Sequence, residues 1–394
     1  MSAVDPAAAA LLVVDDNEDN RYTLGQRLKR LGYANIAFAT NGREALEALR
    51  ARPFDLVLLD VMMPEMNGYE VLGELKADER LRHLPVIMIS ALDQVESVIR
   101  CVELGAEDYL QKPFNPTLLR ARVGASLEKK RLRDEIVAHL ARLELELQSA
   151  REIQLGMVPV EFPQAPPPVH LDVHAALYPA REIGGDLYDF FYSDPQTLCI
   201  AVADVAGKGA PAALFMARTK TLVRMVATLL PGASGPRPSP DEVVARVNTE
   251  LCRDNASLIF VTLFFAMLDL PSRTLSYCNA GHNLPYVVDA SGAVAPVGEA
   301  RGKPLGIRPG FPYATATRTL TPGDCLYLFT DGITEASDAA GRLFEEPRLE
   351  ESLRATAGAP AREIVEATIA RVREFVGDTP QSDDIAAMAI RLVR

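Results

Sequence analysis

Three apolar runs near the start of the chain constrain its fold more than any other feature. They read LLVVDD, DLVLLDV and LPVIMISA, and each is dense in Val, Ile and Leu. Strands that are apolar throughout are buried on both faces, which is typical of parallel sheets covered by helices. Amphipathic segments, NRYTLGQRLKRLG and NGREALEALRAR, lie between them. The first part of the chain is therefore predicted to be an α/β domain with a doubly wound, parallel, five-stranded sheet.

Polar residues lie at the ends of the five predicted strands, which are counted here in chain order. Asp15 and Asp16 follow the first strand, Asp60 ends the third, Ser90 ends the fourth, and Lys112 comes after the fifth. In a parallel sheet these ends meet at one edge, where ligands gather. Three crowded carboxylates repel one another unless a divalent cation joins them, and Mg²⁺ prefers such oxygen ligands. A carboxylate beside Mg²⁺ can attack phosphorus as a nucleophile, with the lysine and serine holding the phosphoryl oxygens.

Residues 10–125 resemble the receiver domain of two-component response regulators, in the motifs VVDDN, LLDVMMPEMNGYEVL, ISA and GAEDYLQKPF. The resemblance implies a sensor histidine kinase as partner and Asp60 as the phosphoacceptor. It implies that Asp15 and Asp16 bind Mg²⁺ together with Asp60. It also implies that Ser90 and Tyr109 form the switch pair and that Lys112 contacts the phosphate. The bond between Lys112 and Pro113 would then be a cis peptide, which proline permits.

A long polar helix is predicted over about 115–157. Its apolar residues alternate by four and three positions, as in a coiled-coil seam: Ile136, Leu140, Leu143, Leu147 and Ala150. This alternation makes two rows along the helix, and Met157 continues one of them. This spacing favours a homodimer or a docking helix, and the alternative is a single helix packed on its own domain. The proline-rich run VPVEFPQAPPP ends the helix. We therefore expect a first domain over 1–124, a linker over 125–168 and a second domain over 169–394.

The second domain combines several strand-like runs with few helices. TLCIAVADV, FVTLFFAMLDL, TLSYCNA, LPYVVDA, DCLYLFTDG and IAAMAIRLV are the strand candidates, and helices are expected at 209–230, 241–253 and near 360–376. Consecutive strands without intervening helices predict an α+β domain with largely antiparallel sheets.

Four acidic turns stand out in this domain. Asp186 lies in EIGGDLYDFF, Asp204 and Asp331 lie at strand ends, and Asp383-Asp384 precede the last strand. Buried strand-end carboxylates are costly unless they share a positive partner. With few His or Cys residues nearby, the set suits Mg²⁺ or Mn²⁺ rather than zinc.

Two other interpretations of the GGD turn explain less. The segment looks superficially like the GGDEF loop of diguanylate cyclases, but prolines and one strand precede it where a cyclase needs nucleotide-binding residues. A structural hairpin would leave the other three acidic turns unexplained.

Residues 150–394 resemble a metal-dependent serine/threonine phosphatase of the SpoIIE/RsbU type, within the PPM superfamily. The motifs, in the family's order, are AREIQLGMVP, REIGGDLYDFF, VADVAGKGAPAALFMA, NAGHNLP, KPLGI, FTDGITEA and SDDIAAMAIR. The resemblance implies a β-sandwich flanked by helices and two Mn²⁺ or Mg²⁺ ions. Two ions about 4 Å apart can activate a bridging water and clamp phosphate oxygens. The implied ligands are Asp186, Asp204, the Val205 carbonyl, Asp331 and Asp383, with Asp384 and Gly185 as possible additions.

Two residues depart from the family's pattern. Ala386 stands where family members often have Thr, and Lys208 stands where some relatives have His. Neither is an implied metal ligand. His282 in NAGHN is interpreted as a structural residue that bonds a turn. No side chain is assigned as general acid.

Composition excludes several classes of function. The formal net charge of −12 and pI near 5.1 argue against nonspecific nucleic-acid binding. No apolar stretch reaches the roughly 18 residues that a spanning helix needs. The first residues lack the basic segment of a signal peptide, so a cytoplasmic location is expected. Five scattered cysteines without a C-x-x-C pair are typical of buried residues in a reducing compartment.

Together these features predict a response regulator whose output is a phosphoserine/phosphothreonine phosphatase. The resemblance suggests a phosphorylated anti-anti-sigma (STAS-domain) protein as substrate, in a partner-switching pathway. The alternative is a non-catalytic adaptor that binds a sigma factor or anti-sigma regulator, and retention of the acidic residues argues against it. Whether phosphorylation activates or inhibits the output stays open.

Overall fold

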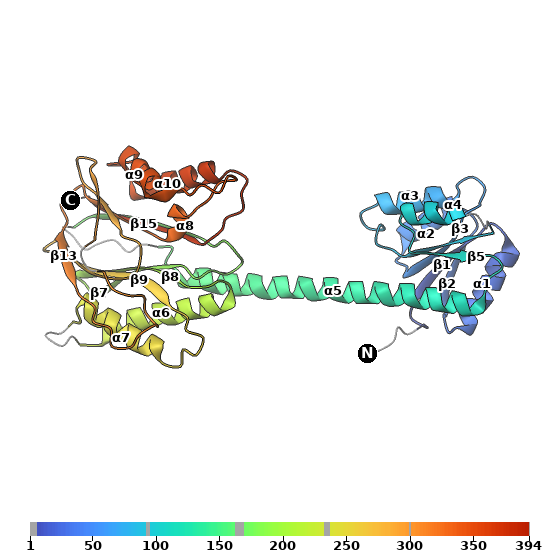
Figure 1. The fold of residues 1–394 in the computed structure, drawn as a ribbon, viewed down its shortest axis with the longest axis horizontal. Helices are drawn as coiled ribbons and strands as arrows, with labels where there is room; N and C mark the ends of the chain where they lie inside the picture. The colour runs from blue at the N-terminus through green and yellow to red at the C-terminus, as the bar shows by residue number, and fades with distance from the viewer. Residues whose placement is uncertain (1–5, 92–94, 162–168, 232–236, 299–300, 394) are drawn as a thin grey trace. The chain divides into compact units, whose positions relative to one another are not determined.

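The computed structural model describes residues 6–91, 95–161, 169–231, 237–298 and 301–393 (Figure 1). The chain divides into two compact units, unit 1 over residues 1–144 and unit 2 over residues 145–394. The division falls within one long helix, α5 (Pro116–Met157), so each unit contains part of it. Among the described helices, none combines the length and hydropathy needed to cross a bilayer.

Unit 1 is built on a parallel sheet with the strand order β2-β1-β3-β4-β5. Its strands are β1 (Ala10–Val14), β2 (Asn35–Ala39), β3 (Leu56–Asp60), β4 (Val86–Ser90) and β5 (Asp108–Gln111). The connecting helices are α1 (Glu18–Arg30), α2 (Gly42–Ala51), α3 (Gly68–Ala77) and α4 (Val95–Glu103). The predicted doubly wound parallel sheet is confirmed.

Alternate residues of the central strands enter opposite cores, which explains why these strands are apolar throughout. Leu12 and Val14 of β1 pack in a core with residues of α2 and α3. Leu11 and Val13 pack in the other core with residues of α1 and the first turns of α5. Burial on both faces leaves the strand ends as the place where polar side chains can gather.

Unit 2 contains two antiparallel five-stranded sheets. The first has the order β13-β10-β9-β8-β7, and the second has the order β12-β11-β14-β15-β6. The first sheet's strands are β7 (Leu187–Asp194), β8 (Thr197–Val205), β9 (Val261–Asp269), β10 (Thr274–Ala280) and β13 (Ala316–Thr319). The second sheet's strands are β6 (Leu171–Tyr178), β11 (Tyr286–Val288), β12 (Val294–Pro296), β14 (Cys325–Phe329) and β15 (Ile385–Leu392).

The helices of unit 2 cover the outer faces of the two sheets. They are α6 (Ala210–Leu229), α7 (Pro240–Cys252), α8 (Asp331–Thr334), α9 (Glu345–Ala355) and α10 (Ala361–Val376). Helices α6 and α7 pack on the first sheet, and α9 and α10 pack on the second (Figure 1). The predicted β-sandwich flanked by helices is confirmed.

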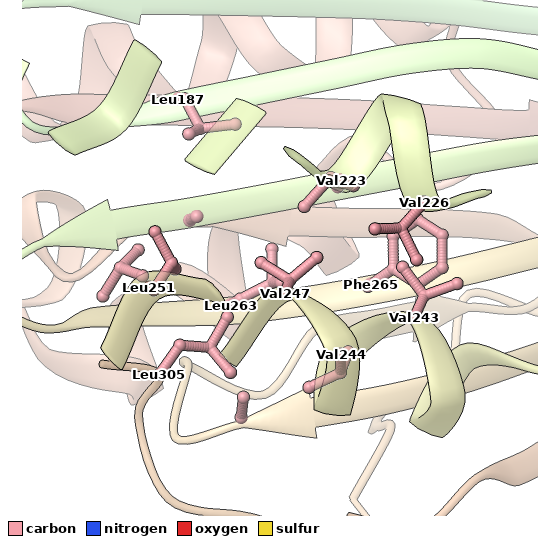
Figure 2. Close-up of a cluster of buried hydrophobic side chains, with 14 of the residues drawn as sticks. Leu187, Val223, Val226, Val243, Val244, Val247, Leu251, Leu263, Phe265 and Leu305 are labelled. Atoms are coloured by element: carbon pink, nitrogen blue, oxygen red, sulfur yellow. The ribbon is translucent and has the colours of Figure 1, made fainter. Parts of the chain in front are cut away.

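Unit 2 has three layers of apolar contact, one between the sheets and one under each pair of helices. The inner layer joins Phe190 and Phe264 of the first sheet to Met388 and Ile390 of the second. Figure 2 shows the layer under α6 and α7, where valines of both helices lie against Leu263 and Phe265 of β9. The two sheets are therefore fixed to each other through a continuous core, which holds their strand ends in register.

The strands predicted from the sequence did not include β7, β12 or β13, and the predicted helices did not include α8 or α9. Strand β7 begins directly after the GGD turn, and α9 covers the second sheet although its sequence, EEPRLEESLRA, is strongly charged. Few residues of α9 face the core, because only Leu349, Ser352 and Leu353 are buried. Such a narrow apolar stripe gives a weak periodic signal.

Helix α5 is exposed along its middle. Every residue from 134 to 149 is exposed, including the four large apolar residues of the predicted seam. Its first turns bury Leu119, Val123 and Leu127 in unit 1, and its last turn buries Gln154 in unit 2.

Candidate functional site

An acidic cluster lies at the carboxyl edge of the sheet in unit 1. Asp15 and Asp16 follow β1, and Asp60 ends the neighbouring strand β3. One carboxylate oxygen from each of the three lies within 4.8 Å of the other two. Within the described part of the chain, this is the only group of three or more His, Cys, Asp or Glu residues that meets this criterion. The strand order reverses between β1 and β3, which is where such sheets bind ligands.

Lys112 neutralises part of this cluster. Its Nζ lies 2.7 Å from Oδ2 of Asp15 and 3.0 Å from Oδ1 of Asp60. Asp15 is fixed further by the amides of Asn17 and Asn20, which donate to its Oδ1. Asp16 is exposed, whereas Asp15 and Asp60 are buried.

Burial dominates the electrostatics of Asp60. It raises the pKa of Asp60 to about 6, against the opposing effect of Lys112, and the charge of Asp15 raises it further. A divalent cation at this edge would stabilise the ionised form. The three carboxylates therefore fit Mg²⁺, and Asp60 offers the oxygen that could attack phosphorus.

The other expected receiver residues lie on the neighbouring strands. Ser90 is buried at the end of β4, and Tyr109 is half-buried on β5, where it pairs with Met88. The backbone amide of Lys112 donates to the Ser90 carbonyl. The peptide bond between Lys112 and Pro113 is cis, as expected.

A second acidic site lies where the two sheets of unit 2 meet. Asp186 precedes β7, and Asp204 is the last residue but one of β8, the antiparallel neighbour of β7. In the second sheet, Asp331 follows β14 and Asp383 precedes its neighbour β15. Because neighbouring antiparallel strands place the end of one beside the start of the next, each sheet brings two aspartates to this edge.

A buried threonine joins the two sheets at Asp186. The Thr330 hydroxyl donates to Oδ2 of Asp186 over 2.6 Å and accepts from the amide of Ala386 over 2.8 Å. Thr330 and Asp186 are both buried. This bond orients one carboxylate oxygen of Asp186 and leaves the other for a further partner.

Asp384 fastens the loop that carries Asp186. Its Oδ2 accepts from the amide of Gly185 over 2.6 Å, and its Oδ1 accepts from the amide of Ala180 over 2.8 Å. A Cβ at Gly184 would lie 2.2 Å from the same Oδ2, and a Cβ at Gly185 would lie 2.7 Å from the Val205 carbonyl oxygen. These close approaches require glycine at both positions. The approach of Gly185 to the Val205 carbonyl places that carbonyl beside the Asp186 loop.

The carboxyl groups at this edge raise one another's pKa. Burial raises the pKa of Asp331 to about 7, and the charges of Asp204, Glu335 and Asp383 add to the effect. Burial likewise raises the pKa of Asp204 to about 6, although contact with Asp186 lowers it. The pKa of Asp186 is raised well above its ordinary value by burial and by Asp204. Without a cation these carboxyl groups are therefore partly protonated near neutral pH, and a bound cation would favour their ionised form.

Lys208 lies at the outer side of this edge. Its Nζ is 3.0 Å from Oδ2 of Asp383 and also donates to the Ser382 carbonyl. Both side chains are partly exposed. Asp383 is thus paired with a lysine that can move away without breaking the core.

His282 bonds a turn beside the acidic edge. Its Nδ1 lies 2.8 Å from the Thr262 hydroxyl and its Nε2 lies 3.1 Å from the Phe329 carbonyl. Burial lowers the pKa of His282 to about 4, so the ring is neutral. A neutral ring donates from Nε2 to the carbonyl and accepts at Nδ1, which engages both nitrogens. The histidine links β9, opposite Asp204, to the end of β14, before Asp331.

The donor set of unit 2 fits hard divalent cations. It offers carboxylates and a backbone carbonyl, and its one nearby histidine uses both ring nitrogens in the turn. Asp186, Asp204, Asp331 and Asp383 converge on one edge with the Val205 carbonyl, while Asp384 is engaged by two backbone amides.

Three residues at this edge were not singled out from the sequence. Thr330 directly precedes Asp331 in FTDGITEA and Glu335 follows it by four residues, and these polar residues around an acidic strand end were a usable signal. Gln154 bonds the backbone of Gly184, and its position seven residues after Leu147 was a signal as well.

Comparison with known families assigns both parts of the chain. The model of stage II sporulation protein E (SpoIIE) matches residues 194–393, and the model of the response regulator receiver domain matches residues 11–124. The first of these covers about half of the chain.

Individual relatives share parts of the chain. The phosphoserine phosphatase RsbU of Bacillus subtilis is 30% identical over 220 residues, 56% of this chain and 62% of RsbU. A probable cyclic di-GMP phosphodiesterase of Vibrio cholerae is 40% identical over 147 residues, 37% of this chain and 33% of that protein. The chain spans between a third and a half of the length of three curated relatives that it matches.

A solved structure supports the fold of unit 2. The SiaA-PP2C domain of Pseudomonas aeruginosa superposes with a TM-score of 0.56 at 23% identity, covering 64% of this chain and 98% of that domain. At this identity the likeness concerns the fold.

Proposed function

Because the chain belongs to the SpoIIE family and carries a response regulator receiver domain, we propose that it is a phosphorylation-controlled, metal-dependent phosphoserine/phosphothreonine protein phosphatase. The observation that carries the proposal is the convergence of Asp186, Asp204, Asp331 and Asp383 on one edge of unit 2. In the proposed arrangement, the receiver occupies residues 1–124, the linker 125–168 and the phosphatase 169–394.

The acidic edge would hold two Mn²⁺ or Mg²⁺ ions. Such ions supply an activated water and neutralise the charge of the phosphoryl group. Asp186, Asp204, the Val205 carbonyl, Asp331 and Asp383 would hold these ions. Thr330 orients Asp186 through its 2.6 Å bond to one carboxylate oxygen, which would leave the other oxygen for a cation. Lys208, which is partly exposed and paired with Asp383, would turn to the substrate phosphate.

Unit 1 would supply the input. A sensor histidine kinase would donate a phosphoryl group to Asp60, with Mg²⁺ held by Asp15, Asp16 and Asp60. Lys112, which already contacts two of these carboxylates, would neutralise the added charge. Ser90 and Tyr109 would act as the switch pair that changes the β4–β5 face.

The substrate and location are parts of the same proposal. RsbU, a phosphoserine phosphatase, shares 30% identity over 220 residues. A phosphorylated STAS protein in a partner-switching pathway that releases a sigma factor is the substrate class that this relationship favours. Such a circuit, with its kinase and sigma factor, would operate in the cytoplasm.

The linker helix would make the protein a homodimer. Ile136, Leu140, Leu143 and Leu147 form one apolar stripe on α5, and all four are exposed. Such a stripe is costly in water, and its heptad spacing suits a parallel helical pair.

The decisive experiment measures phosphate release from a phosphorylated STAS protein. The full-length protein should release phosphate with Mn²⁺ and none with EDTA, and beryllofluoride should change the rate through Asp60. Asp204→Asn serves as the inactive control, and Asp378→Asn, on an exposed loop after α10, serves as the matched surface control. Beryllofluoride is tested on wild type and on Asp60→Ala in parallel.

A different pattern would favour the adaptor alternative. If the wild-type protein binds the STAS protein or a sigma factor but releases no phosphate at any Mn²⁺ concentration, the phosphatase assignment is wrong.

A further inference from the structure

The last turn of α5 is bonded to the loop of Asp186 by a single buried side chain. Gln154 donates from Nε2 to the Gly184 carbonyl over 2.6 Å and accepts at Oε1 from the Gly184 amide over 3.0 Å. Only 5% of Gln154 is exposed. The side-chain amide of Gln154 thus bonds both the N–H and the C=O of Gly184, as the backbone of a neighbouring strand would.

Gly184 is held from its other side by Asp384. A Cβ at Gly184 would lie 2.2 Å from Oδ2 of Asp384, which also accepts from the Gly185 amide. The backbone two residues before Asp186 is therefore enclosed between Gln154 and Asp384. Since Thr330 holds Oδ2 of Asp186, we expect a shift of Gly184 to turn the carboxylate about that bond.

Gln154 lies on the same row of α5 as the apolar stripe. Leu147 precedes it by seven residues, and Leu140 precedes Leu147 by seven. Residues seven apart share a face of an α-helix, to within about 20° of rotation. The row is apolar and exposed at Leu147 and becomes polar and buried at Gln154.

We infer that Gln154 is a positioning residue for the metal site, which sets the Asp186 carboxylate through the backbone of Gly184. This inference rests on the proposed function, because it assigns Gln154 to the site that would hold the cations. A rotation of α5 would reach that site at Gln154. Outer partners of metal ligands typically change metal affinity by roughly 10–100-fold when they are replaced.

The test measures Mn²⁺ affinity directly, from the signal of free Mn²⁺ in electron paramagnetic resonance. The full-length protein carries Asp16→Asn, which removes one carboxylate of the unit 1 cluster, and Asp186→Asn identifies the sites of unit 2. Gln154→Met keeps the side-chain volume and removes both bonds. Gln148→Met is the matched control, because Gln148 is exposed on the same helix and bonds only Glu152.

Gln154→Met should weaken Mn²⁺ binding by roughly 10–100-fold, and Gln148→Met should leave it unchanged. Phosphatase turnover should recover at saturating Mn²⁺, with KM for the phosphoprotein unchanged. If Gln154→Met does not fold, Gln154→Asn is used, since its shorter amide cannot keep both bonds.

Two results would overturn the inference, and they are distinguishable. If the Gln154 variant melts at a lower temperature but keeps wild-type Mn²⁺ affinity, Gln154 only fastens the helix. If protein with Gln154 intact shows no Mn²⁺ binding that Asp186→Asn removes, the proposed metal site itself is wrong, and the inference is overturned with it.

Discussion

The hydroxyl of Thr330 lies 2.6 Å from Oδ2 of Asp186 and donates to it, which joins the second sheet of unit 2 to the loop that precedes the first. The same hydroxyl accepts from the Ala386 amide at the start of β15. One buried threonine therefore fixes both an acidic side chain and the register of two strand ends. It opposes the burial that raises the pKa of Asp186.

Replacing Thr330 by valine should lower the metal affinity of the site without leaving a cavity in the core. Thr330→Val keeps the shape and removes the bond to Asp186, so the carboxylate loses its orientation and the Ala386 amide loses an acceptor. We expect Mn²⁺ affinity and phosphatase turnover to fall by roughly 10–100-fold. Titration with Mn²⁺ and a phosphoprotein assay measure this, with Thr221→Val on the exposed face of α6 as control. Wild-type affinity in Thr330→Val would show that Asp186 needs no such support.

Replacing a site carboxylate by an amide should have opposite effects on activity and on metal-free stability. Asp331→Asn removes a proposed cation ligand, so turnover should fall by more than the roughly 10–100-fold that the loss of an outer partner costs. It also removes a buried charge that repels Asp204, so in EDTA at pH 8 the melting temperature should rise. Thermal melts with and without Mn²⁺ measure both effects, with Asp378→Asn as control. A lower melting temperature in EDTA would contradict the repulsion.

Metal-free stability should fall as pH rises. The folded protein raises the pKa of Asp204 to about 6 and that of Asp331 to about 7, above the ordinary value of about 3.9. A raised carboxyl pKa contributes stability that is complete below the unfolded pKa and is lost as pH rises through the folded value. Melting temperatures in EDTA should therefore decline between pH 5 and pH 8. Mn²⁺ should reduce the decline, and so should Asp204→Asn/Asp331→Asn, while Asp60, whose pKa is also raised to about 6, accounts for a remainder. A double variant that declines as steeply as wild type would contradict the assignment to Asp204 and Asp331.

The sequence predicted the layers of both units because their patterns are strong. Strands β1, β3 and β4 are apolar on both faces, and that pattern admits few folds besides a covered parallel sheet. The helix α9 was missed because its EEPRLEESLRA sequence places only a narrow stripe against the core. Burial there depends on the neighbouring α8, α10 and β12, which the local sequence does not specify.

The candidate sites were predictable to the level of the acidic side chains but not of their supports. Aspartates at strand ends can be recognised in the sequence from their residue type and from their position after an apolar run. Thr330 and Gln154 act through buried hydrogen bonds to Asp186 and Gly184, which lie 144 and 30 residues away in the sequence. Such pairings depend on how the two sheets and the end of α5 pack, so only the structure identifies them.

Asp60 should be the one aspartate that accepts a phosphoryl group in unit 1. It ends β3 beside Asp15 and Asp16, and Lys112 lies 3.0 Å from its Oδ1. Acetyl phosphate or beryllofluoride with Mg²⁺ should modify the wild-type protein and leave Asp60→Ala unmodified. Intact mass and NMR shifts of Ser90 and Tyr109 give the readout. Equal labelling of Asp60→Ala would place the phosphoacceptor elsewhere.

The apolar stripe of α5 should hold the protein together as a dimer. Leu140 is 54% exposed and Leu147 is 36% exposed, although both belong to the row that ends at buried Gln154. Leu140→Glu/Leu147→Glu places four like charges in a parallel pair, so light scattering should report a monomer. The helical pair would fix how α5 is rotated where Gln154 bonds Gly184. Without the pair, the response of phosphatase turnover to beryllofluoride should therefore be lost as well. Leu145→Glu is the matched control, since Leu145 is 70% exposed on the same helix but lies off the stripe. If the double variant stays as oligomeric as the control and keeps its response, α5 transmits nothing through this seam.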